Sequence, residues 1–276
     1  AAGRSWQYLQ AIALAGPSIH PAFHASHFWV WPDARTPAIQ ADLVSLGSER
    51  WLGRGWLASA SVFARTAQGV ALPDPDTGAL GRRRPLYVVG TNEARGLELN
   101  LRRIGAQWSA SFGYTHGRSD LELADITFPS SADRRHVFDA MLGVRVARGL
   151  RVAAAYTAMS GAPFTRAYAV TREGCMNFGF HCNTPDGSYV QQPNAERTPA
   201  YGSLDGALQW AQPFGPIELS AYFQVRNVLD RDNASTYAGS RPIRRFPVRN
   251  GVTYEFEDRF EKGLPRLPLV GLRLTF

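Results

Sequence analysis

Apolar and non-apolar residues alternate without a break at the end of the chain. In the segment 270–276, one face of an extended strand would carry three aliphatic residues and the terminal Phe276. The other face would carry Gly, Arg and Thr. Such a strand suits a wall between lipid and a water-filled lumen, but a soluble β-sandwich could contain one as well. Whether the alternation repeats therefore decides the fold class.

The alternation does repeat along the chain. Segment 216–226 places Ile, Leu, Ala, Phe and Val on one face and Glu, Ser, Tyr, Gln and Arg on the other. The pattern is clear at 97–102, 108–115 and 138–146, and weaker at 39–50, 56–66, 151–160 and 201–211. With a strand near 1–8, this predicts about ten strands, each close to the roughly 9–11 residues of a tilted membrane crossing. No run approaches the ~18 apolar residues of a transmembrane helix.

The connections between these segments alternate between short and long. Short ones lie near 51–55, 103–106, 147–150 and 212–215, and long ones at 9–38, 67–92, 119–133, 161–200 and 227–266. We therefore predict an all-β, antiparallel up-and-down transmembrane β-barrel in the bacterial outer membrane, with short periplasmic turns and long extracellular loops. The mean hydropathy of −0.23 fits such a barrel, because every second residue faces water.

Two residue sets follow from this topology. Aromatic side chains beside the short turns and at the terminus would form a girdle at the membrane interface: Trp51, Trp56, Trp108, Trp210 and Phe276. A soluble protein could also cap hairpins with tryptophan. Polar residues at alternate strand positions would face the lumen: Glu98, Arg102, Asp139, Arg145, Gln224 and Arg226.

Four short motifs occur in order at matching places in the strand pattern. They are GTNEARGLELNL at 90–101, DRRHVF at 133–138, SGAPFT at 160–165 and VRNVLDR at 225–231. With the terminal Phe276, these motifs make the chain resemble the C-terminal barrel part of TonB-dependent outer-membrane receptors.

The resemblance implies a barrel of about 22 strands around an N-terminal plug. Residues 1–276 would then be a single partial barrel domain, roughly its last ten strands, with the plug and signal peptide absent from this sequence. It also implies energised uptake of a scarce solute, an inner-membrane energy-coupling partner reached through the missing N-terminal region, and contact with outer-membrane lipid and lipopolysaccharide. No enzymatic activity, metal or cofactor is expected.

In that interpretation, aromatic residues of the long loops would hold the solute, a siderophore or a glycan: Phe28, Trp29, Trp31, Tyr168 and Phe178. Cys175 and Cys182 lie in one such loop and predict a disulfide, because export passes through the oxidising periplasm. The alternative is a metal pair assisted by His181.

The net charge of +7 and the pI near 9.8 could suggest a nucleic-acid partner. The basic residues are dispersed, however, and no recognition motif accompanies them, so we expect none. Two loop clusters, Arg82–Arg84 and Arg241 with Arg244 and Arg245, could contact lipid phosphates or an anionic ligand, or simply be solvated.

Two other functions and one candidate metal site are alternatives to consider beside transport by a receptor. A passive porin would use the polar lumen residues directly for ion selection. An outer-membrane enzyme could use His136, Asp133 and Asp139, although the place of His136 at a strand start favours a structural role. His20, His24 and His27 could share one face of a helical turn and bind a metal, but solvated or aromatic-packed histidines are the favoured interpretation.

Overall fold

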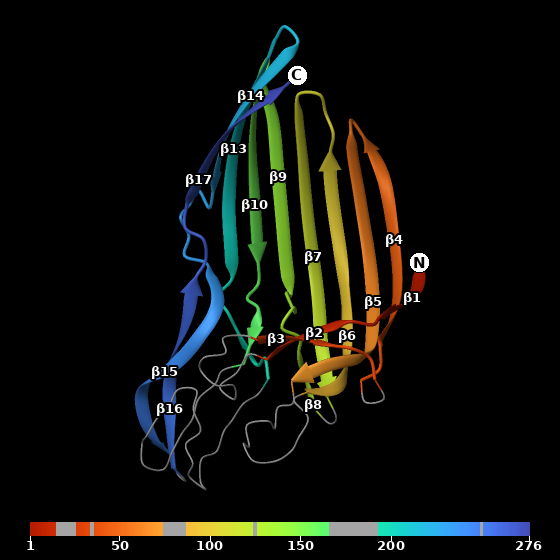
Figure 1. Cartoon of the computed structure of the whole chain (residues 1–276), viewed down its shortest axis with the longest axis vertical. Coiled ribbons are helices and arrows are strands. Elements are labelled where there is room, and N and C mark those ends of the chain that lie inside the picture. Colours follow the sequence, from red (N-terminus) through yellow and green to blue (C-terminus); the bar gives the residue numbers. More distant parts are fainter. Residues whose placement is uncertain (15–25, 34–35, 74–86, 124–125, 166–192, 249–250) are drawn as a thin grey trace.

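A computed structural model describes the chain except for residues 15–25, 34–35, 74–86, 124–125, 166–192 and 249–250 (Figure 1). Side chains are also left undescribed at 12–14, 26–28, 73, 240–248 and 251–256. The described residues form β-strands and their connections. No helix in this part of the chain is long and apolar enough to cross a membrane.

Ten strands form one antiparallel sheet in which each strand pairs with the next of the set. They are β1 (Ala2–Gln7), β4 (Ile39–Gly53), β5 (Trp56–Pro73), β6 (Tyr87–Arg103), β7 (Trp108–Leu123), β9 (His136–Ala147), β10 (Leu150–Met159), β13 (Tyr201–Phe214), β14 (Ile217–Arg226) and β17 (Leu267–Thr275). The predicted fold class and its ten strands are confirmed. The sheet curves but does not close: β1 and β17 each have one neighbour in it (Figure 1).

The long connections contain more structure than the alternation predicted. They hold the pairs β2 (Gln10–Leu14) with β3 (Ser26–Val30), β11 (Pro163–Phe164) with β12 (Glu196–Arg197), and β15 (Ala234–Val248) with β16 (Gly251–Lys262). The short β8 (Ile126–Pro129) pairs with β7. The long connections between the ten strands therefore carry hairpins of their own, which the alternation does not predict.

Strands β5, β6 and β7 also extend into segments predicted as loops. They have 18, 17 and 16 residues, more than the roughly 9–11 of a membrane crossing. Their extensions carry charges such as Glu93, Arg95 and Arg118 on the same face as Leu97 and Leu99. Outside the hydrocarbon both faces of a strand meet water, so the alternation fades while the backbone pairing continues.

The short turns lie together at one end of the sheet, and the longer connections lie at the other (Figure 1). Neighbouring turns bond to each other: the Ile104 N–H donates to the Gly55 carbonyl at 2.9 Å, and the Ala211 N–H donates to the Gly149 carbonyl at 2.8 Å. A Cβ on either glycine would stand 2.2 Å from the neighbouring carbonyl oxygen, and both have positive φ. Glycine therefore permits this close approach.

Strand register defines two faces of the sheet. Directly opposed residues share a face, and one row across six strands is entirely apolar: Trp108, Val144, Val152, Leu208, Phe223 and Val270. We call this the apolar face. The opposite, polar face carries rows such as Ser109, Gly143, Ala153, Ala207 and Gln224.

Apolar packing concentrates at the end with long connections. Leu72, Leu121 and Leu123 are buried against Val70, Val88 and Phe128. Phe164 stacks on Tyr237 with ring centroids 4.3 Å apart, and Phe260 meets both rings. By contrast, Val270 and Leu272 on the apolar face are more than three-quarters exposed, as expected for side chains that contact lipid.

The tryptophans beside the short turns divide between the two faces. Trp56, Trp108 and Trp210 lie on the apolar face, and Phe276 continues the alternation of β17 on that face. Trp56 and Trp108 meet edge to face at 6.0 Å, with the Arg103 guanidinium 3.5 Å above the Trp108 ring. Trp51 opposes Leu57, which opposes Arg102, so Trp51 lies on the polar face and not beside the other three.

This division predicts a difference in lipid contact. In single-tryptophan variants of the intact protein, brominated lipids should quench Trp210 fluorescence strongly and Trp51 fluorescence weakly. Of these two residues, only Trp210 lies on the apolar face, which we expect to meet the bilayer. Equal quenching of the two would contradict the face assignment.

Candidate functional site

The hairpin β2–β3 is fixed to the sheet by a buried glutamine. A bulge between Gln68 and Val70, with Gly69 at φ +82°, frees two backbone groups of β5. Gln10 satisfies both: its Nε2 donates to the Gly69 carbonyl and its Oε1 accepts from the Ala71 N–H, each at 2.8 Å. Val30 of the hairpin is buried against Ala71 and Tyr87.

This anchorage presents two aromatic side chains to solvent at the extracellular end. Trp29 and Trp31 flank the buried Val30 and are 65% and 71% exposed. Two large exposed rings on an anchored hairpin form a surface suited to stacking against a ligand. Of the other predicted ligand residues, Tyr168 and Phe178 lie outside the described residues, and the side chain of Phe28 is not described.

Several further predictions also fall outside the described part. Cys175, Cys182, His20, His24 and Arg82–Arg84 lie there, as do the side chains of His27, Arg241, Arg244 and Arg245. The disulfide and the lipid-phosphate clusters stay predictions.

A buried carboxylate ties four segments together at the extracellular rim. Asp133 is 1% exposed. Its carboxylate accepts hydrogen bonds from Arg197, from Arg135 Nε at 2.8 Å and from the Ser119 N–H at 2.9 Å. Arg197 also donates to the Asp133 and Gly161 carbonyls, each at 3.0 Å. Burial raises the pKa of Asp133, but the hydrogen bonds from Arg197, Arg135 and Ser119 outweigh it, so the pKa lies below its ordinary value.

A second rim junction is built on Asn227, which is 4% exposed and has φ +51°. Its N–H donates to Asp205 at 2.9 Å, and its amide donates to the carbonyls of Arg231 and Leu264. The nearby Asn233 exchanges two 2.9 Å hydrogen bonds with the backbone of Gly202. Together these amides join the extracellular ends of β13, β14 and β17.

The six predicted lumen residues all share the polar face. They come from β6 (Glu98, Arg102), β9 (Asp139, Arg145) and β14 (Gln224, Arg226). Glu98 accepts from Ser61 Oγ at 3.2 Å, and Asp139 accepts from Thr157 Oγ1 at 2.7 Å. The prediction missed three further polar residues of this face, Arg151, Asp205 and Gln209. Their segments, 151–160 and 201–211, alternate only weakly and carry small or mixed residues.

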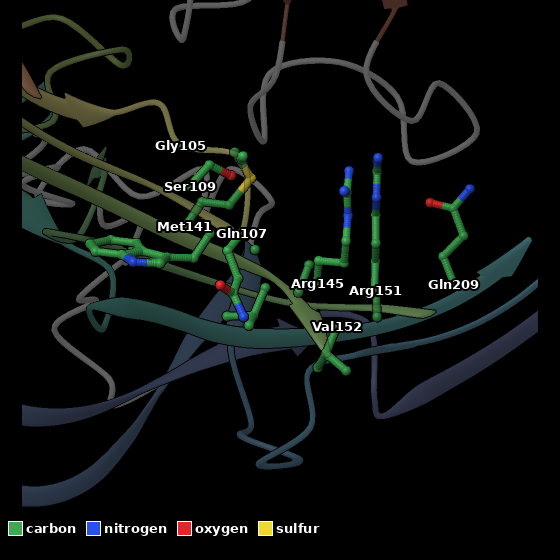
Figure 2. A pocket seen from close by; sticks show the side chains of 14 residues that line it. Gly105, Gln107, Ser109, Met141, Arg145, Arg151, Val152 and Gln209 are labelled. Carbon is green, nitrogen blue, oxygen red and sulfur yellow. The ribbon is translucent and has the colours of Figure 1, made fainter. Parts of the chain in front are cut away.

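A hollow of about 460 Å³ opens near the periplasmic turns (Figure 2). Its lining includes Ser109, Met141, Arg145, Arg151 and Gln209, all on the polar face. Small residues at Gly143, Ala153 and Ala207 leave the space between them. The chemistry available there is that of cationic and amide donors.

The three residues that an outer-membrane enzyme could use do not lie together. His136 lies on the apolar face, where its Nδ1 is 2.8 Å from the Tyr114 hydroxyl. Asp139 lies on the polar face, and Asp133 is enclosed by two arginines. Within the described residues, no group of three His, Cys, Asp or Glu side chains is placed to hold a metal.

Comparison with known proteins agrees with this geometry. Residues 38–228, more than half of the chain, match the family described as TonB dependent receptor-like, beta-barrel. The chain belongs to the TonB-dependent receptor family. The family's members are receptors and transporters of the bacterial outer membrane, not enzymes, and this barrel lies in that membrane. No curated protein matches the chain.

Two solved receptors share the fold. The ferric-catecholate import receptor Fiu of Escherichia coli K12 superposes with a TM-score of 0.54 at 14% identity over 99% of this chain. The FrpB iron transporter of Neisseria meningitidis gives 0.51 at 16% identity over 87%. The chain spans 32% of the length of each.

Three of the four motifs behind the resemblance have structural roles at the rim. Asp133 of DRRHVF, Gly161 of SGAPFT and Asn227 of VRNVLDR make the contacts that close strand ends against one another. A Cβ on Gly161 would meet the Thr198 carbonyl oxygen at 1.7 Å, so no other residue fits there. In the described residues these motifs therefore join strand ends at the extracellular rim.

The Asp133 junction predicts a pH-dependent rim. Asp133→Asn in the intact receptor should lower the free energy of unfolding by about 3 kcal/mol at pH 7, because Arg135 and Arg197 lose the buried carboxylate that balances their charge. A carboxyl with a lowered folded pKa stabilises above its unfolded pKa, about 3.9, and loses that contribution as pH falls through the folded value. Calorimetry at pH 7 and pH 3 should therefore show a smaller acid loss in the variant.

The matched control is Asp232→Asn. Asp232 pairs with Lys262 at 2.8 Å, but both side chains are more than 75% exposed, so no measurable change is expected. An Asp133→Asn variant as stable as this control would contradict the role of the junction.

Proposed function

We propose that this chain is the C-terminal wall of a TonB-dependent receptor that takes up a scarce solute across the outer membrane. In this proposal residues 1–276 are one partial barrel domain. A plug domain of the same longer protein fills the lumen, and an inner-membrane protein supplies the energy for transport.

The open sheet is the observation that carries the proposal. β1 and β17 each leave one edge unpaired in the described part of the chain. Lipid does not tolerate unpaired backbone groups, so both edges need further strands. The polar face supports a filled lumen, because it presents charged side chains to a space that the described residues leave open. A chain covering about a third of Fiu and of FrpB agrees with the need for further strands.

The solute we propose has ring surfaces, as in a ferric catecholate siderophore or a glycan. Trp29 and Trp31 offer two exposed rings at the extracellular mouth, and aromatic faces stack on catechol and sugar rings. Fiu is described as a ferric-catecholate import receptor and FrpB as an iron transporter. These descriptions favour the siderophore as the first solute to test.

Uptake in energised cells tests the proposal. Iron-starved cells that make the intact receptor should accumulate radioactive iron from a ferric catecholate siderophore, and removal of the inner-membrane coupling protein should abolish accumulation. A passive porin would behave differently: entry would not depend on coupling, and the purified protein would conduct ions steadily. That result would overturn the proposal.

The tryptophan pair predicts where the solute is first held. Replacing Trp29 and Trp31 with Ala in the intact receptor should weaken siderophore binding about tenfold or more, as expected when aromatic anchors are removed. Binding can be measured by titration of the purified receptor.

Trp6→Ala is the control, because Trp6 is 55% exposed but lies on the apolar face of β1. Equal binding by the double variant and the control would place the solute elsewhere in the mouth.

A further inference from the structure

Two arginines stand side by side on the polar face near the periplasmic turns. Arg145 of β9 and Arg151 of β10 are directly opposed in the ladder, and Gln209 of β13 opposes Arg151 on its other side. Figure 2 shows the three side chains extended in the same direction, while Val152 points to the other face. Two cationic groups thus share one small area of the lumen wall.

This pair lacks a counter-charge in the described part of the chain. No described residue forms an ion pair or hydrogen bond with the guanidinium group of Arg145 or of Arg151. The nearest carboxylates on the polar face of β9, β10 and β13 are Asp139, six residues from Arg145, and Asp205, which opposes Ala155 four residues from Arg151, so each lies more than roughly 13 Å away along the strands. Asp205 already accepts hydrogen bonds from Ser203 and from the Asn227 N–H. Asp139 also has a partner of its own, Thr157. Like charges directly opposed across a ladder are destabilising unless an anion lies between them.

The surroundings leave room for such an anion. Gly143, Ala153 and Ala207 border the pair within the 460 Å³ hollow, and none of them fills it with a side chain. Gln209 adds a neutral amide donor beside the guanidinium groups. Each guanidinium group can donate two N–H groups to the two oxygens of a carboxylate.

We propose that Arg145 and Arg151 bind an Asp or Glu side chain of the plug domain and fix the plug to the barrel wall near its periplasmic end. The two guanidinium groups repel each other whether or not a solute is bound. A permanently bound carboxylate is therefore favoured over one that belongs to a transported solute. The hollow has room for a protein segment that carries the carboxylate. This inference rests on the proposed function, since it requires a plug.

Zero-length cross-linking in the full-length receptor tests it. Arg151→Lys places a primary amine at the site, and a carbodiimide joins an amine to a carboxylate only when the two are in ion-pair contact. Mass spectrometry of the digested protein should find residue 151 joined to an Asp or Glu of the plug. The yield should be at least tenfold above that from Arg148→Lys, an exposed position in the adjacent turn. Adding Arg145→Gln to Arg151→Lys should reduce the yield severalfold.

The outcomes separate the two proposals. If the plug is present but residue 151 joins only barrel residues or nothing, the inference is overturned and the receptor function stands. If inorganic phosphate protects residue 151 and no plug link forms, the pair is a free-anion site, which also overturns the inference. If the full-length protein has no plug, the proposed function fails first.

Discussion

The main sheet of this chain depends on the backbone hydrogen bonds of one continuous antiparallel ladder. Inside a bilayer no water replaces a missing partner, so each N–H and C=O of a crossing strand must bond to a neighbouring strand. Once the ten strands are paired, each side chain lies on one of the two faces of the sheet. The row from Trp108 to Val270 then lies on the apolar face, and the row containing Arg145, Arg151 and Gln209 lies on the polar face.

The same ladder explains which parts of the fold could be predicted. Where one face meets lipid and the other meets water, alternation is enforced residue by residue, and segments such as 216–226 are legible from the sequence alone. Beyond the membrane, β5, β6 and β7 continue with water on both faces, and pairing no longer requires alternation. The hairpins inside the long connections were missed for that reason. Trp51 was assigned from its nearness to a turn, which does not fix the face of a side chain.

The sequence predicts which polar residues share a face of the sheet, but it does not predict which of them lie side by side. Alternation identified Glu98, Arg102, Asp139, Arg145, Gln224 and Arg226 as one polar set, and the ladder places them on one face. The partnership of Arg145 with Arg151 could not be derived in this way. A regular two-residue hairpin that pairs Ala147 with Leu150 would set Arg145 opposite Val152, but a register shift after Leu150 brings Arg151 there instead. The buried junctions at Asp133 and Asn227 likewise depend on contacts far apart in sequence.

The distance between the two sheet edges tests the central claim most directly. Spin labels at Ser5 of β1 and Leu267 of β17, which lie at comparable distances from the short turns, report in the intact protein in outer membrane whether these strands are neighbours. As part of a large receptor barrel they should lie more than about 20 Å apart, four or more strand spacings. A short distance typical of paired strands would show a closed ten-strand barrel and contradict the account.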